Sequence, residues 1–243
     1  PTTSDTGSEV GRASVIINEE QTRKAIIFHP KMLPGRVIAD PALTIGLPAK
    51  ITAAVGMDAL SHNLEALCAP SFHPQAEGIA IEGMRLISQS LIRTFEDGSD
   101  IEARAHMMVA SLMGAAAFQK GLGAMHAMSH PIGAHLKAHH GLINAIVMPY
   151  VLEHNKTAIE LKMKRLSQVL ELAEPGTNAV IRWVNDLRKK LNIPNTLTAI
   201  NMQEHHCKLL APLAVQDPSA GGNPIALTEK DYEKLFRTAL NGH

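Results

Sequence analysis

The sequence changes in character at Pro48, and this change limits the folds open to the chain. Before Pro48, two apolar runs rich in β-branched residues, 13–18 and 24–29, flank the polar stretch 19–23, which is typical of a β-hairpin. After it, the pattern is that of helices separated by Pro, Gly and Asp. Aromatic residues make up only 3% of the chain, which favours helix over sheet. The sequence therefore predicts a mainly α fold, an all-helical body with a small β-containing piece in front.

The body is predicted to contain a series of helices that begin and end at recognisable residues. Pro48 suits the first helical position because its missing N–H needs no partner there, and Asp100 and Thr228 are good N-caps. A short strand is expected around residues 36–39, and the clearest loop is 217–224, with the sequence DPSAGGNP. The predicted helices cover residues 48–68, 74–95, 100–120, 122–136, 142–154, 158–172, 178–191, 202–214 and 229–240.

Composition excludes several classes of protein. Lysine and arginine number 23 and are balanced by 23 acidic residues, so no basic excess indicates a nucleic-acid partner. The longest apolar run, 142–152, is too short for a membrane span and is interrupted by Asn144 and Pro149. The two cysteines, Cys68 and Cys207, are too few for a disulfide framework. We therefore expect buried, inert thiols and a cytoplasmic location.

The first candidate site residues lie in the stretch GMDALSHNLEA. Asp58 and His62 are four residues apart on a predicted helix, which puts them on one face with Cβ atoms about 5–6 Å apart. A carboxylate oxygen and an imidazole nitrogen at this separation can bind one metal ion. Taken alone, the pair is also compatible with an incidental surface neighbourhood.

Histidine is the second signal, because five of the 13 histidines fall within residues 126–140. His126 and His130 again have a spacing of four, and His140 stands before Gly141 at an expected helix end. Two imidazoles on one helical face with a third ten residues later can form a metal-binding cup. The other two histidines of the cluster, His135 and His139, are assigned to the core.

One aspartate and three histidines provide three nitrogen donors and one oxygen donor without a thiolate. Such a set suits divalent iron, zinc or cobalt and disfavours magnesium and calcium, which prefer oxygen ligands. Four protein ligands leave a position for a substrate oxygen, as Lewis-acid catalysis requires. An activated water would fit the same position, so a metal-dependent hydrolase is an alternative.

Four stretches together resemble the iron-containing alcohol dehydrogenases, a family related in fold to dehydroquinate synthase and glycerol dehydrogenase. They are PTTSDTGSEV, DPALTIGLPAKITAAVGMDALSHNLEA, GLGAMHAMSHPIGAHLKAHHGLINAIVMPYVLEHN and DPSAGGNP. The resemblance extends over essentially the whole chain. It implies that residues 1–47 are the C-terminal part of the nucleotide-binding α/β domain, with its hairpin and connector. Residues 48–243 would then be the helical metal-binding and catalytic domain.

The resemblance also assigns roles to individual residues. It implies that His130, the second histidine of HxMxHPxG, lies close to the nicotinamide and substrate and belongs to the proton path. The metal ligands that it implies are Asp58, His62, His126 and His140. The cofactor-binding residues that it implies are Thr2, Thr6 and Lys24.

The activity implied by the resemblance is NAD(P)-dependent interconversion of an alcohol and an aldehyde or ketone at one divalent metal ion. The metal would be Fe(2+), with Zn(2+) as the other candidate, and the cofactor NAD or NADP. The implied partners are a small alcohol or aldehyde substrate and further copies of the chain in a homo-oligomer, with no nucleic acid and no membrane.

The chain departs from the family pattern in two places. Asp5 replaces the glycine in the middle of TTxGTGSE, and a carboxylate there would repel a pyrophosphate unless it points away. The family's glycine-rich turn, which holds that phosphate, has no counterpart after Pro1, so we expect a truncated form. A non-catalytic metal-binding helical fragment is therefore another alternative.

Overall fold

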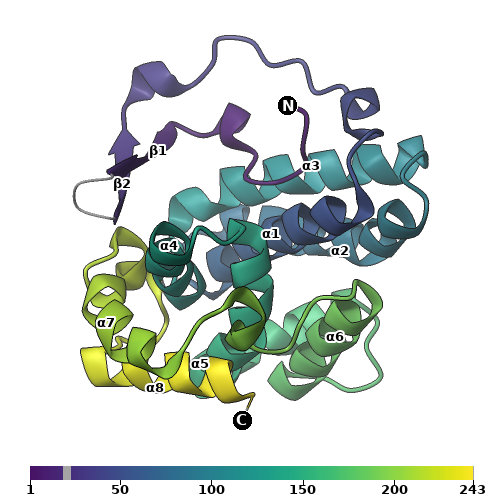
Figure 1. Ribbon diagram of the computed structural model, residues 1–243. Helices are drawn as coiled ribbons and strands as arrows, with labels where there is room; N and C mark the ends of the chain where they lie inside the picture. Colours follow the sequence, from purple (N-terminus) through teal and green to yellow (C-terminus); the bar gives the residue numbers. More distant parts are fainter. Residues whose placement is uncertain (19–22, 243) are drawn as a thin grey trace.

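The computed structural model describes residues 1–18 and 23–242, and helices dominate this part of the chain (Figure 1). The predicted mainly α fold is confirmed. No helix within the described residues has the length and hydropathy needed to span a bilayer. The helices are α1 (Ala49–Cys68), α2 (Pro74–Glu96), α3 (Ile101–Ala117), α4 (Ala124–Leu136), α5 (His140–Val169), α6 (Thr177–Lys190), α7 (Glu204–Val215) and α8 (Glu229–Asn241).

Helix α1 lies at the centre of the fold. Every residue from Thr52 to Cys68 is buried, and the helix contacts α2, α3 and α5 (Figure 1). The enclosed residues include the polar side chains of Asp58, His62 and Glu65, which need partners inside the protein. Both cysteines are buried, as predicted, and burial raises the pKa of the Cys68 thiol to about 12. The remaining helices pack around α5, which contacts α4, α6 and α8.

Two lysines close the C-terminal end of α1. Lys120 donates its Nζ protons to the carbonyl oxygens of Ala66, Leu67 and Ala69 at 2.8–3.2 Å. The Nζ of Lys162 bonds to two of the same carbonyls. Because the last carbonyls of a helix have no partner within it and carry negative partial charge, two cations here stabilise the end of α1.

The two strands pair as the hairpin prediction requires. Strand β1 (Ala13–Asn18) runs antiparallel to β2 (Arg23–Phe28), with Ala13 opposite Phe28. The predicted turn includes residues 19–22, which lie outside the described residues. The strand predicted at 36–39 is wrong: these residues are exposed and belong to no strand. A β-branched sequence alone does not form a strand when no neighbour accepts its backbone hydrogen bonds.

One predicted helix boundary in the body is also wrong. The helices expected at 142–154 and 158–172 are a single helix, α5, which runs from His140 to Val169. No glycine or proline separates the two stretches, and Asn155 at the expected break is buried with its side chain hydrogen-bonded to Asn223. Asn155 therefore makes a tertiary contact from the middle of α5 and does not end the helix.

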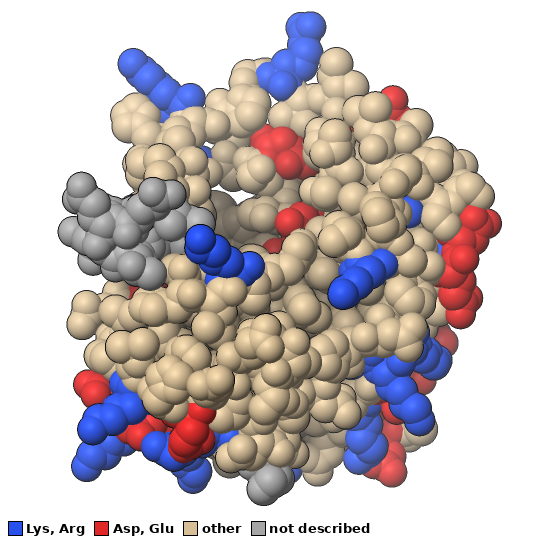
Figure 2. All heavy atoms as spheres, in the orientation of Figure 1, with Lys and Arg blue, Asp and Glu red and all other residues tan. Residues whose placement is uncertain are grey.

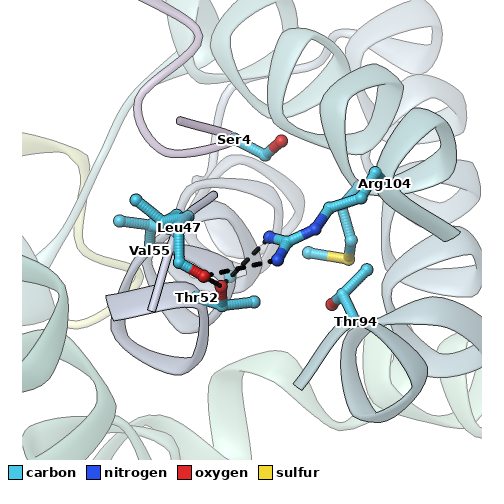
Figure 3. A pocket seen from close by; sticks show the side chains of 8 residues that line it. Ser4, Leu47, Thr52, Val55, Thr94 and Arg104 are labelled. Atoms are coloured by element: carbon cyan, nitrogen blue, oxygen red, sulfur yellow. Dashed lines mark hydrogen bonds between the residues drawn. The ribbon is translucent and has the colours of Figure 1, made fainter. Parts of the chain in front are cut away.

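The opening segment is tied to the helical body by buried polar contacts. Arg104 on α3 donates to the Thr52 hydroxyl at 3.0 Å and reaches Leu47 O, and Ser4 lines the same small pocket (Figure 3). Ser111 on α3 donates to the carbonyl of Asp5 at 3.0 Å. The residues that follow Ser4 are thereby held against α3.

The central position of α1 makes a stability prediction. Leu64 on α1 has no exposed surface, so Leu64→Ala leaves a cavity and should lower the free energy of unfolding by about 2–5 kcal/mol. Leu161 on α5 is 82% exposed, so Leu161→Ala should change the free energy of unfolding by less than about 0.5 kcal/mol. Urea denaturation followed by circular dichroism measures both; equal effects would contradict the central burial of α1.

Candidate metal centre and cavity

Helix α1 brings the first two predicted ligands into the protein interior. Asp58 has no exposed surface and His62 is 3% exposed. The spacing of four puts both on one face of the helix, with Asp58 Oδ2 and His62 Nδ1 3.6 Å apart. The sequence pair is therefore buried, and the incidental surface alternative is wrong.

The other two predicted ligands come from two further helices. His126 on α4 has its Nε2 atom 3.0 Å from His62 Nε2, and His140 Nε2 lies 3.7 Å from Asp58 Oδ1. Ligand atoms of Asp58, His126 and His140 all lie within 4.8 Å of one another. The structure thus brings the four residues together. His140 begins α5, whereas the sequence suggested a position at a helix end.

A glycine allows α5 to approach α1 at this point. A Cβ atom added to Gly141 would overlap the carbonyl oxygen of Ala54 and lie 3.0 Å from Asp58 Cβ. Since Gly141 follows His140 directly, the same close approach brings the His140 ring to Asp58. A larger residue would separate the two helices where they contribute ligands.

Glu65, which the sequence analysis missed, fixes His126 and the start of α4. Its Oε2 atom lies 2.7 Å from His126 Nδ1, and its Oε1 accepts from the backbone N–H of Met125 at 2.6 Å. A carboxylate that accepts the Nδ1 proton leaves Nε2 of His126 with its lone pair toward His62. Glu65 follows Asp58 by seven residues, so its place on the same helical face was a usable signal.

Asn144, also missed, bonds to the carboxylate. It lies four residues after His140 on α5, is fully buried, and donates from Nδ2 to Asp58 Oδ1 at 2.6 Å. The same nitrogen lies 3.2 Å from His140 Nε2 and 3.3 Å from His126 Nε2. Ser129 Oγ is 3.3 Å from the other nitrogen of His140, Nδ1. Each of these contacts restricts the orientation of a predicted ligand.

The environment sets the protonation of the site. Burial lowers the pKa of His62 to about 4, partly opposed by the charge of Asp58. Burial would raise the pKa of Asp58, but the charges of His62 and His140 outweigh it and lower that pKa. Burial would also lower the pKa of His126, but the hydrogen bond and charge of Glu65 raise it. A neutral His62 and an ionised Asp58 are the forms that bind metal.

The donor set fits a divalent cation. Within the described part of the chain, the buried atoms Asp58 Oδ2 and His62 Nδ1 have no hydrogen-bond partner. Buried polar atoms normally have partners, and an ion is one explanation when they do not. Three imidazoles and one carboxylate suit iron or zinc.

The four residues lie beside a cavity of about 780 Å³. Its walls include His62, His126, His130 and His140 from the helices, and segments from the opening and from both strands. Figure 2 shows that the surface of the molecule is hollowed, with atoms of acidic residues visible in the hollow. Other lining residues include Thr6, Ser8, Val15, Phe28, Phe118 and Pro218.

The three predicted cofactor-binding residues differ in their position relative to this cavity. Thr6 lines it, whereas Thr2 is exposed and is not among the lining residues of the described chain. Lys24 lies on β2, and its side chain falls outside the described residues. Asp5, which replaces the family's glycine, also lines the cavity.

His130 is buried beside the predicted ligands. Its ring stacks on His140 with centroids 5.4 Å apart, and its Nδ1 atom lies 2.8 Å from Asp217 Oδ2. Asp217 is a third residue that the sequence analysis missed, and the DPSAGGNP loop was its only signal. The core assignment is wrong for His139, which is exposed, while His135 is half-buried and bonds to the carbonyl of Pro131.

Comparison with known protein families matches most of the chain. Residues 52–240 match the description Fe-containing alcohol dehydrogenase family, C-terminal. The chain belongs to this family. All four predicted ligands, together with Glu65, Asn144 and Asp217, lie inside the matched region.

Individual members of the iron-containing alcohol dehydrogenase family match nearly the whole chain. The 4-hydroxybutyrate dehydrogenase of Cupriavidus necator is 38% identical over 251 residues, which cover 99% of this chain and 64% of that protein. The 1,3-propanediol dehydrogenase of Citrobacter freundii is 34% identical over 250 residues, covering 98% and 64%. The chain therefore spans about 64% of the length of these relatives.

Solved structures show the same fold. A crystal structure of 1,3-propanediol oxidoreductase superimposes with a TM-score of 0.94 at 33% identity, covering 98% of this chain and 64% of that one. Sulfoacetaldehyde reductase from Bifidobacterium kashiwanohense, solved in complex with NAD+, gives a TM-score of 0.91 at 26% identity, covering 100% and 64%.

The contact between α1 and α5 can be tested at Gly141. Gly141→Ala should push the helices apart, lower stability by about 1–3 kcal/mol and weaken metal binding, because a backbone carbonyl cannot move aside easily. Gly78 on α2 has open space where a Cβ would lie, so Gly78→Ala is the matched control and should keep metal affinity. Thermal unfolding and zinc titration measure the two effects. Unchanged zinc affinity in Gly141→Ala would contradict the role of the contact.

The role of Glu65 makes a second prediction. In Glu65→Gln the amide N–H would face Nδ1 of His126, so the ring would carry its proton on Nε2 and lose its lone pair toward the site. Metal affinity should fall by about 10–100-fold. Competition with a zinc chelator measures it, and Glu82→Gln, at a half-exposed position on α2, is the control. Wild-type affinity in Glu65→Gln would show that His126 does not depend on this carboxylate.

Proposed function

We propose that the chain is the metal-binding and catalytic part of an NAD(P)-dependent oxidoreductase that interconverts an alcohol and an aldehyde or ketone. One observation carries this proposal: Asp58, His62, His126 and His140 meet beside a cavity of about 780 Å³ that is also lined by His130 and Thr6. The sequence resemblance implied these same residues as a metal site, a proton path and a cofactor contact. Family membership supports the reaction class.

The metal is proposed to be Fe(2+), with Zn(2+) as the other candidate, held by these four residues. When bound, a divalent cation here supplies Lewis acidity that favours the deprotonated form of an alcohol oxygen. Glu65 restricts the His126 ring and Asn144 restricts the Asp58 carboxylate, so these donor atoms are arranged before a metal ion binds. NAD or NADP is proposed as the hydride acceptor, in line with the NAD+ complex of sulfoacetaldehyde reductase.

The residues around the cavity can divide the remaining tasks. His130 is proposed to accept the hydroxyl proton and pass it to water. Phe28, Phe118 and Val15 line the cavity and are proposed to present apolar surface to the carbon chain of the substrate. Thr6, Thr2 and Lys24 are proposed to contact the cofactor, with Thr6 supported by its position in the cavity wall.

The substrate is proposed to be a small alcohol or aldehyde. Three of the relatives are named for 4-hydroxybutyrate, 1,3-propanediol and sulfoacetaldehyde, which are short molecules with a hydroxyl or aldehyde group, and another is named a long-chain-alcohol dehydrogenase. A homo-oligomer in the cytoplasm remains a prediction from the sequence.

Two histidine variants separate metal binding from proton transfer. His126→Ala should remove metal and activity together, because it deletes a ligand. His130→Ala should keep the metal and lower the rate by about 10²–10⁴-fold, the usual size of a general acid–base contribution. Metal analysis and NADH oxidation with an aldehyde measure both, in a preparation that includes the cofactor-binding region.

His205→Ala, at an exposed position of α7, is the matched control and should match the wild type. A metal-free His130→Ala protein would overturn the division of roles. Hydrolysis of an ester without any NADH-dependent reduction would instead favour a metal-dependent hydrolase. Metal binding with no stabilisation by NAD or NADP and no activity would favour the non-catalytic fragment.

A further inference from the structure

The loop that follows α7 brings a carboxylate into contact with His130. Asp217 precedes the short helical turn η6 (Pro218–Gly222), and its Oδ2 atom lies 2.8 Å from His130 Nδ1. Its other oxygen, Oδ1, accepts the backbone N–H of Ser219 at 2.8 Å. Both side chains are only 8% exposed. The carboxylate is thus held at both oxygens, one of them by the histidine.

The loop itself is anchored without help from Asp217. Asn223 at its far end accepts the N–H of Ala124, the first residue of α4, at 3.2 Å. It also exchanges two hydrogen bonds of 2.9 Å with Asn155 on α5. A Cβ atom on Gly222 would overlap the carbonyl of Leu122, so the loop lies directly against the segment before α4. The position of Asp217 relative to α4 is therefore set by several contacts.

The carboxylate determines which nitrogen of His130 carries the proton. Burial would raise the pKa of Asp217, but the hydrogen bond and charge of His130 and the Ser219 N–H lower it, so Asp217 is ionised at neutral pH. An ionised carboxylate only accepts hydrogen bonds, which requires the proton of a neutral His130 on Nδ1. Nε2 is then an acceptor in a ring that lines the cavity.

We propose that Asp217 is a positioning residue that fixes the orientation and the Nδ1–H tautomer of His130, so that Nε2 of the ring carries a lone pair and not a proton. The role of Nε2 as the acceptor of a substrate proton rests on the proposed function. The hydrogen bond between Asp217 and His130 does not depend on that role. A carboxylate that holds a catalytic imidazole in the correct tautomer is a well-understood catalytic device.

The tautomer can be measured directly by NMR. In protein labelled with ¹⁵N-histidine, metal-free or loaded with Zn(2+), the His130 signals are those lost in His130→Gln. Wild-type protein should show the Nδ1–H form. In Asp217→Asn, which is nearly isosteric, the amide should donate to Nδ1 and convert His130 to the Nε2–H form. A wild-type His130 in the Nε2–H form would overturn the proposal without any need for the variant.

Kinetics provide the second readout, in a preparation that oxidises alcohol with NAD or NADP. Asp217→Asn should lower kcat by about 10²–10⁴-fold, leave KM and metal content near the wild type, and add nothing further in the His130→Gln background. Asp231→Asn is the matched control, because Asp231 caps the exposed start of α8 and lies outside the cavity lining. Unchanged kcat in Asp217→Asn would overturn the proposal.

The two readouts keep this proposal separate from the proposed function. If no preparation shows alcohol oxidation, the proposed function fails, and the NMR measurement still decides whether Asp217 fixes the tautomer. If oxidation is present and the tautomer is the same in wild type and Asp217→Asn, only the positioning role fails.

Discussion

Much of this structure depends on compensating one buried negative charge. Asp58 has no exposed surface and lies on the central helix, and an isolated carboxylate in such a place would be strongly destabilising. Its compensation comes from Asn144 and from imidazoles on three helices. Helices α1, α4 and α5 must therefore meet at Asp58. The same requirement therefore governs how these three helices pack and how the candidate metal centre is assembled.

That meeting is possible only because small residues lie between the helices. Gly141 lets α5 reach the backbone of α1, and an added Cβ there would overlap Ala54. On the opposite side, a Cβ on Gly114 of α3 would approach the side chains of Asn63 and His62. At this density most buried polar atoms need a partner at short range, and Asp58 Oδ2 and His62 Nδ1 are exceptions that face the candidate metal centre. The predicted ligands are therefore held by close backbone packing as well as by their own hydrogen bonds.

The sequence predicted the parts of this arrangement that depend on helical periodicity. Asp58 and His62 share a face because they are four residues apart, and the same holds for His126 and His130. Glu65 follows the same rule and could have been found. Asp217 could not, because it is 87 residues from His130 and only tertiary packing brings the loop to α4. The wrong strand at 36–39 has the same cause, since strand pairing depends on a distant partner.

His126 and His130, which are proposed to bind the metal and to move the proton, are restrained by different parts of the fold. His126 is held by Glu65, which belongs to the same helix as Asp58, so this predicted ligand is oriented from within the helical core. His130 is held by Asp217, which belongs to a loop attached to α4 and α5 through Asn223. The His130 ring also stacks on His140, so the loop and one predicted metal ligand both restrict its orientation. The residue proposed to move the proton is therefore restrained in part by a loop that contributes none of the predicted metal ligands.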